Sequence, residues 1–137
     1  MALIETPATV FRPGMTEVLK VTSDPVRNIT GKTFKLTLRA DPDYKALLAG
    51  QRHLKDPDPA TVAASWAVIL TTTEVVVYDA TNGVFGMVAR KANWLATDQF
   101  GTQRGIYDIV DTTDAANPWP VIGPRWADIV SPAYPLT

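Results

Sequence analysis

The sequence predicts an all-β domain, a β-sandwich of about seven short strands. The 137-residue chain has a hydrophobic content of 46%, but eleven prolines and eight glycines divide it into short segments. Apolar segments that are too short for most helices but long enough for strands favour a β fold. Residues 34–39 give the clearest pattern, because Phe34, Leu36 and Leu38 alternate with Lys, Thr and Arg. This period of two indicates a strand with one buried face and one wet face.

The other strands are expected between turn signals spread along the chain. The strongest turn signal is Asn82-Gly83, because both residue types accept a positive φ. Strands are expected at residues 16–23, 32–40, 65–71, 74–79, 84–90 and 104–113, followed by a last hairpin around Gly123-Pro124. Trp94-Leu95 is expected to anchor either one turn of helix or a crossing loop. Short strands at this spacing are typical of a sandwich.

A short helical insertion is expected near residues 41–60. Asp41 can cap a helix, Pro42 suits its first turn and Gly50 its end. A polar loop broken by prolines follows, and together the two form a decoration longer than most loops.

The length fits a single domain with extended ends. Residues 1–14 contain two prolines and a glycine, and are expected to form an extended arm or an edge strand. The sandwich is expected over residues 15–131, and residues 132–137 as an extended tail.

Composition argues against several classes of function. Thirteen basic and fourteen acidic residues give a net charge of −1, which does not suggest a nucleic-acid surface or a polybasic membrane anchor. The chain has no cysteine, and its start lacks the basic and apolar regions of a signal peptide. No segment approaches the apolar length of a membrane span. We therefore expect a soluble protein made in the cytoplasm, with neither nucleic acid nor membrane among its partners.

No catalytic or metal-binding motif is apparent, so the sequence predicts neither an enzyme nor a cofactor. His53 is the single histidine, which excludes a histidine-rich metal site. "TGKT" at residues 30–33 lacks the preceding glycines of a phosphate loop, and a strand follows it instead of a helix. Paired aspartates before prolines, at residues 41–43 and 56–58, could hold calcium but are also ordinary turn chemistry.

The run "RGIYDIVDTTD" at residues 104–114 resembles a small acidic site, but structural roles explain it better. Asp108, Asp111 and Asp114 recur every third residue, which does not place them on one face of a strand. We expect Tyr107 to be half-buried with its hydroxyl bonded to nearby backbone. We expect Asp108 to bond a turn amide or to protect a sheet edge, and Asp111 and Asp114 to form turns.

The aromatic side chains leave a second class of function open. Trp66 lies in an apolar segment and is expected in the core. Trp94, Trp119 and Tyr134 could instead form a stacking surface in a carbohydrate- or receptor-binding module.

Two motifs give a resemblance to small tail and baseplate proteins of bacteriophages. "GKTFKL" supplies Gly31, Thr33, Phe34 and Leu36, which match an early strand motif of that family. The later matches are Gly105, Tyr107, Asp108 and Ile109, then Gly123 and Val130. Lys32 replaces an acidic residue of the pattern, and one of its two tyrosines is missing.

The resemblance implies an immunoglobulin-like sandwich and a structural role in a virion, at the tail, baseplate, neck or capsid surface. Its partners would be other virion proteins and further copies of the chain, in a homo-oligomer or symmetric array. The extended ends suit this role, because an unpaired segment can add to the sheet edge of a neighbour. The expected interface residues are Phe11, Arg12, Tyr44, Arg52, His53, Trp94, Trp119, Trp126 and Tyr134.

Overall fold

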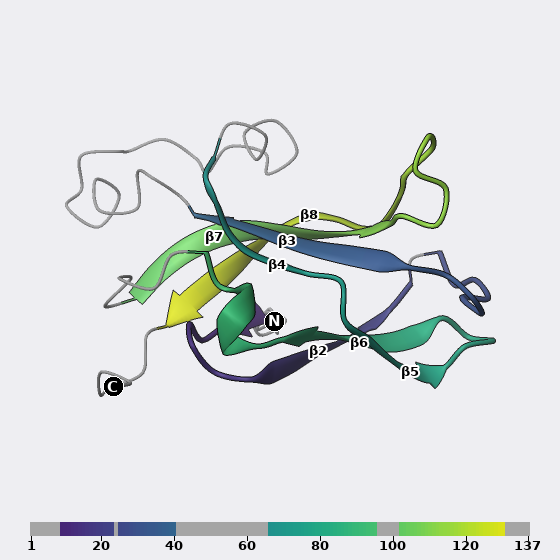
Figure 1. The fold of residues 1–137 in the computed structure, drawn as a ribbon, viewed down its shortest axis with the longest axis horizontal. Helices are drawn as coiled ribbons and strands as arrows, with labels where there is room; N and C mark the ends of the chain where they lie inside the picture. Colours follow the sequence, from purple (N-terminus) through teal and green to yellow (C-terminus); the bar gives the residue numbers. More distant parts are fainter. Residues whose placement is uncertain (1–8, 24, 41–65, 96–101, 131–137) are drawn as a thin grey trace, which may run out of the picture.

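The protein is described by a computed structural model that places residues 9–23, 25–40, 66–95 and 102–130. Figure 1 shows two β-sheets facing one another. The strands are β1 (Thr9–Phe11), β2 (Glu17–Thr22), β3 (Phe34–Ala40), β4 (Val68–Thr72), β5 (Val75–Asp79), β6 (Val84–Ala89), β7 (Thr102–Asp111) and β8 (Trp119–Val130). Among the residues described, the one helical element is a single 3-10 turn, η2 (Lys91–Asn93). The prediction of an all-β fold is therefore confirmed.

The strands form a large sheet and a small sheet. The large sheet has the order β1-β8-β7-β3-β4, and the small sheet the order β2-β6-β5. All neighbouring strands are antiparallel except β1 and β8, which pair in parallel with Thr9 opposite Ala127. Successive strands β4 and β5 belong to different sheets, so the chain crosses from one layer to the other between Thr72 and Val75.

The core lies between the two sheets and follows the alternation read from the sequence. Phe34, Leu36 and Leu38 of β3 are buried, while Lys35 between them is exposed. Phe34 stacks on Phe85 of β6 with ring centroids 4.3 Å apart, which joins the large sheet to the small one. Further core residues are Phe11, Ile29, Ile69, Leu70, Met87, Ala89, Trp94, Tyr107, Ile109, Val121, Ile122, Ala127 and Ile129.

Most strand predictions are confirmed, but the last hairpin is wrong. β8 runs unbroken through Gly123-Pro124 instead of reversing there. The chain reverses earlier, between β7 and β8, and the register of that pair shifts near Ile109. The glycine and proline are accommodated at this irregularity, as both residue types often are in edge or bulged strands.

The N-terminal segment contributes an edge strand to the domain itself. β1 covers residues 9–11, so eight strands are seen where about seven were expected. The helical insertion expected near 41–60 and the tail at 132–137 lie outside the described residues.

The Asn82-Gly83 turn is confirmed, and the structure shows why glycine is needed there. Gly83 has a φ of 71°. A Cβ on it would also come within 2.7 Å of the Arg27 carbonyl oxygen, so both the conformation and the space exclude a side chain.

Candidate interaction surface

The outer face of the small sheet carries exposed apolar side chains. Val18 of β2 is 49% exposed, and Val76 and Tyr78 of β5 are 41% and 51% exposed. They lie on the side of the sheet that faces away from the core, because Leu19, Val21 and Val75 pack against the core instead. We call Val18, Val76 and Tyr78 the outer apolar face.

Gly86, at the centre of this face, allows the side chains around it to lie close to the backbone. A Cβ at Gly86 would lie 2.6 Å from Cγ1 of Val18 and 3.1 Å from Cε2 of Tyr78. The Lys20 ammonium lies 5.3 Å from the centre of the Tyr78 ring, within cation–π range. The tyrosine therefore lies across β6 toward β2, and three strands share one continuous surface.

β5 also presents an open backbone edge. It is the outermost strand of the small sheet (Figure 1). The Val88 amide donates to the Glu74 carbonyl over 2.9 Å, which fixes the alternation of hydrogen-bonded pairs along β5 and β6. Val76 and Gly86 then form the next hydrogen-bonded pair. The amides and carbonyls of Val75 and Val77 consequently point away from β6, toward the open edge.

The other sheet edges of the described residues are short, interrupted, covered or charged. β1, the outermost strand of the large sheet, is only three residues long. In β8, Pro120 and Pro124 interrupt the outer edge beyond the three residues that β1 covers. β4 is covered by a bridge between Leu70 and Trp94. β2 carries Glu17 and Lys20, charged residues of the kind that blunt an edge.

β5 has no such protection along Val75–Val77. Acidic residues stand at its two ends, and both are engaged within the chain. Glu74 pairs with Arg90 at 2.8 Å, and Asp79 accepts a hydrogen bond of 2.8 Å from the side-chain amide of Asn82. These contacts lower the pKa of both carboxyl groups, mainly through the hydrogen bonds from Arg90 and Asn82. Within the described part of the chain, β5 is thus the least protected edge.

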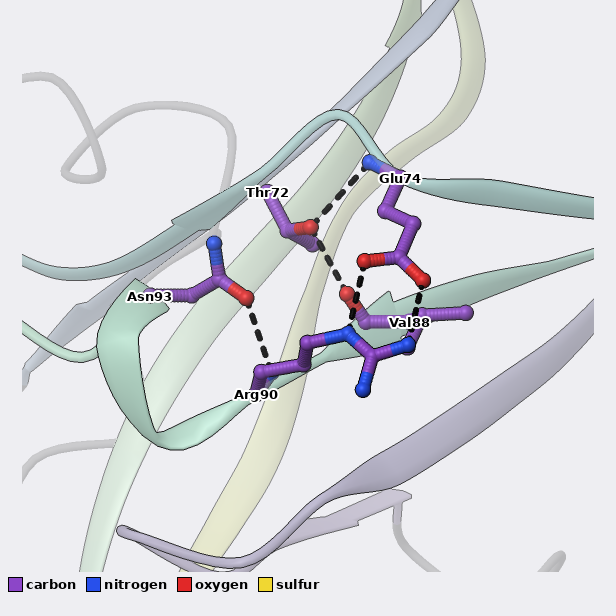
Figure 2. A network of polar contacts seen from close by, with 5 residues as sticks. All are labelled: Thr72, Glu74, Val88, Arg90 and Asn93. Carbon is purple, nitrogen blue, oxygen red and sulfur yellow. Dashed lines mark hydrogen bonds and ion pairs between the residues drawn. The ribbon is translucent and has the colours of Figure 1, made fainter.

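A polar network fixes the start of β5 where the chain changes sheets. Figure 2 shows the Thr72 hydroxyl donating to the Val88 carbonyl (2.7 Å) and accepting from the Glu74 amide (3.2 Å). The Arg90 guanidinium holds both oxygens of Glu74 at 2.8 Å, and the Arg90 amide donates to Oδ1 of Asn93. The end of β4 is thereby bonded to the end of β6, and the first residues of β5 have a fixed direction.

The structure does not bring the interface residues expected from the sequence together at one surface. Phe11 and Trp94 are 3% and 5% exposed and belong to the core. Arg12 is exposed and pairs with Glu17 at 3.0 Å. Tyr44, Arg52, His53 and Tyr134 lie outside the described residues.

Trp119 and Trp126 lie on β8 and each contacts an arginine. Trp119 is 47% exposed, and the guanidinium of Arg27 lies 5.0 Å from its ring centre. Trp126 is half-buried. Its ring centre lies 4.0 Å from the guanidinium carbon of Arg104 and 5.8 Å from the ring centre of Trp66. Trp66 is buried, as expected. Of the three residues considered for a carbohydrate platform, Trp119 alone is described and exposed.

Tyr107 is buried rather than half-buried, and its hydrogen bond differs from the one expected. The side chain is 4% exposed, and its hydroxyl shares a 3.1 Å hydrogen bond with the hydroxyl of Thr9, not with nearby backbone. The parallel pairing of β1 with β8 places Thr9 within reach of β7, a long-range contact with no local sequence signal. This bond ties β1 to the centre of the large sheet.

Asp111 and Asp114 form turns, as the sequence suggested, whereas Asp108, expected to bond a turn amide or to protect an edge, lies on the inner strand β7. Asp111 accepts a hydrogen bond from the Thr113 amide, and Asp114 accepts one from the Ala116 amide, so both form turns. Asp108 is half-buried on the other face of the large sheet from Tyr107. Burial raises its pKa, while the charges of Arg39 and Lys35 partly offset that effect.

One pocket formed by described residues is too small for a typical small-molecule ligand. This pocket of about 40 Å³ lies between β1 and β2, lined by residues that include Phe11, Glu17 and Met87. Pockets for small molecules usually measure about 300–1,000 Å³. The described residues contain no group of three potential metal ligands and no helix long and apolar enough to cross a membrane.

The sequence analysis missed Val76 and Tyr78, although a signal was present. Residues 75–78 read Val-Val-Val-Tyr without alternation, and a strand with one buried face must then expose part of that run.

Comparisons of the chain with family models, with curated proteins and with solved structures each find no match.

Proposed function

We propose that this chain is an immunoglobulin-like structural protein of a tailed-bacteriophage virion, which acts by assembling with itself and with other virion proteins. The proposal combines the resemblance of its strand motifs with the surface described above. The position in the particle would be the tail, baseplate, neck or capsid surface.

The strand order supports the immunoglobulin-like part of the proposal. In such folds strands B, E and D form one sheet, and C, F and G form the other, with C′ added beside C in variable-type domains. Here β2, β6 and β5 take the places of B, E and D, and β4, β3, β7 and β8 those of C′, C, F and G. The chain departs from antibody domains in having no cysteine and no tryptophan in β3.

The residues of the phage-like motifs also have physical roles that suit this fold. Gly31 has a φ of 73° in the turn before β3, and Phe34 and Leu36 are in the core. Gly105 and Tyr107 lie on β7 where it pairs with β3, opposite Ala40 and Leu38. The motif therefore coincides with positions that the sandwich requires.

One observation carries the functional part: the outer apolar face lies beside the unprotected edge of β5. Exposed valine and tyrosine next to free backbone groups form a surface suited to strand addition from another chain. Edge pairing between copies is a common way to build symmetric assemblies.

The proposal is tested on particles of the phage whose genome encodes the chain. Particles purified on a density gradient are expected to contain the protein at a fixed ratio to the other structural proteins, as measured by quantitative mass spectrometry. A control for carry-over is a non-structural protein from the same lysate, which should be depleted. Absence of the chain from intact particles, with no virion genes beside its own gene, would reject the proposal.

A further inference from the structure

We infer that two copies of this chain associate through antiparallel pairing of their β5 strands about a two-fold axis at Val76. The inference rests on the proposed function and names the partner of the β5 edge, a second copy. Pairing two three-stranded sheets in this way makes one sheet of six strands, in the order β2-β6-β5-β5-β6-β2.

The backbone determines which registers are possible. Val75 and Val77 point their amides and carbonyls to the open edge, whereas those of Val76 are used within the small sheet. An antiparallel partner must therefore place its own Val75 or Val77 opposite one of these residues. Centring the axis on Val76 places Val75 opposite Val77 of the second copy, and Val77 opposite its Val75. Both pairs then exchange two backbone hydrogen bonds each.

A register centred on Val77 is the nearest alternative, and it is weaker. It gives a single pair, Val77 with itself, inside the regular part of β5. The next pair would involve Asp79, which lies beyond the register shift between Val77 and Asp79. Each backbone hydrogen bond contributes about 0.5–1.5 kcal/mol, so the axis at Val76 is favoured.

The side chains fit this register. The two Val76 side chains become a non-hydrogen-bonded pair, the type that brings side chains closest. Each Tyr78 comes opposite Glu74 of the other copy, so no acidic residue faces an acidic residue. The outer apolar face of one copy continues into that of the other, so the exposed side chain of Val76 packs against its counterpart across the axis.

A second copy also explains why β5 differs from the other edges. The outer edges of β8, β4 and β2 each have a device that discourages pairing, namely prolines, a covering bridge and charges. Acidic residues stand at the two ends of β5, where Glu74 is bound by Arg90 and Asp79 by Asn82. Residues 75–77 between them carry no charge. Pairing about a two-fold axis uses the β5 edge of both copies, so this type of pairing closes as a dimer.

The test is a disulfide cross-link in the full-length chain. The protein has no cysteine, so Val76→Cys introduces the only thiol. Non-hydrogen-bonded antiparallel pairs have Cα atoms about 4.5 Å apart, within the range of about 4.4–6.8 Å that disulfides require. In a glutathione redox buffer at micromolar protein, we expect most of Val76→Cys to become a covalent dimer, read by non-reducing gel electrophoresis.

The matched control is Val18→Cys. Val18 lies on the same face with similar exposure, 49% against 41%, but on the opposite edge strand. Its β5 edge is intact, so it should still associate, but it should run without a covalent cross-link on the same non-reducing gel. Equal cross-linking of the two variants would indicate random collision or face-to-face packing, and no cross-link at Val76 would mean that β5 does not pair in this register. Either result overturns the inference.

A charge at the edge gives an independent measurement. Val77 is 53% exposed, and Val77→Lys places an ammonium group against Val75 of the second copy. We expect the dimer dissociation constant from analytical ultracentrifugation to rise at least tenfold, with an unchanged circular dichroism spectrum. An unchanged dissociation constant in the folded variant would contradict β5 pairing, and the cysteine variants decide the matter if Val77→Lys does not fold.

The two proposals can fail separately. If the wild-type chain is present in particles but Val76→Cys does not cross-link, the virion role stands, and the β5 edge then receives a strand of a different virion protein or none. If the dimer forms but the chain is absent from particles, the pairing stands without the virion role.

Discussion

Gly105 lies on β7 where the backbone of β3 passes too close for a side chain. A Cβ at this position would clash with the Arg39 carbonyl oxygen and would lie 3.0 Å from Cδ1 of Ile129. Alanine would therefore force β3 and β7 apart, which overpacks the sheet. The glycine in "RGIYDIV" is thus needed by the contact of two strands, and Tyr107 two residues later is needed for its bond to Thr9.

Asp108 is the residue whose charge opposes folding at neutral pH. Burial raises its pKa above 3.8, so the folded protein holds the proton more tightly than the unfolded chain does. The resulting stabilisation is fully present below about pH 3.8 and is lost as the pH rises through the folded-state pKa.

Replacement of Asp108 by asparagine should remove this dependence. Relative to wild type, Asp108→Asn should gain stability as the pH is raised from about 3.5 to about 7, measured as urea midpoints across that range. Asp114→Asn is the control of opposite sign, because hydrogen bonds from Asn117 and Ala116 lower the pKa of Asp114. That variant should lose stability relative to wild type over the same rise. Identical trends for the two variants would contradict the assignment.

At the scale of elements, the crossing from β4 to β5 depends on one hydroxyl group. Thr72 is 3% exposed, and its side chain satisfies both the Val88 carbonyl and the Glu74 amide. Without it, two backbone groups at the junction of the sheets would have no partner. The Arg90–Glu74 salt bridge is exposed to solvent, so it orients the start of β5 but contributes little to the stability of the fold.

Thr72→Val keeps the shape of the side chain and removes the hydroxyl. We expect the free energy of unfolding to fall by about 1–3 kcal/mol, the cost of leaving buried polar groups unpaired, measured by urea denaturation. Thr71→Val, one residue earlier on the same strand and half-buried, should change it by no more than about 0.5 kcal/mol. Equal effects of the two substitutions would show that the hydroxyl of Thr72 is not what matters.

The elements that the sequence predicted well are those with a strong local pattern. β3 alternates cleanly, and the Asn82-Gly83 turn has its own backbone requirement. β8 was misread as a hairpin because Gly123-Pro124 is a local turn signal, and the pairing that overrides it comes from β7. The candidate surface was not predicted at all, because exposure of Val76 depends on which sheet receives β5, a tertiary choice.

At the scale of the whole molecule, the two layers are joined by polar and apolar contacts. Thr72 and Val88 join them by a hydrogen bond, and Phe34 and Phe85 join them by stacking in the core. Within the large sheet, Phe11 of β1 packs against Tyr107 of β7 with ring centroids 5.5 Å apart. Phe11, which the sequence analysis placed at an interface with a partner, instead holds the first strand to its own domain.

Phe11→Ala tests this role. Truncating a buried phenylalanine costs about 3–5 kcal/mol, a large part of the roughly 5–15 kcal/mol that stabilises a typical domain. Differential scanning calorimetry should show a markedly lower Tm. Arg12→Ala, next in the sequence and exposed, loses a surface ion pair worth at most about 1 kcal/mol. A Phe11→Ala variant as stable as Arg12→Ala would mean that β1 does not contribute to the core.

The pairing of β1 with β8 has a consequence for the order in which the protein can form. β1 precedes every other described strand in the chain, and β8 follows them all. During synthesis the first strand leaves the ribosome with no sheet edge to join, since its neighbour has not yet been made. The backbone of β1 therefore has no strand partner until translation has passed residue 129, and the nascent chain must wait for its last described strand before it can pair its first.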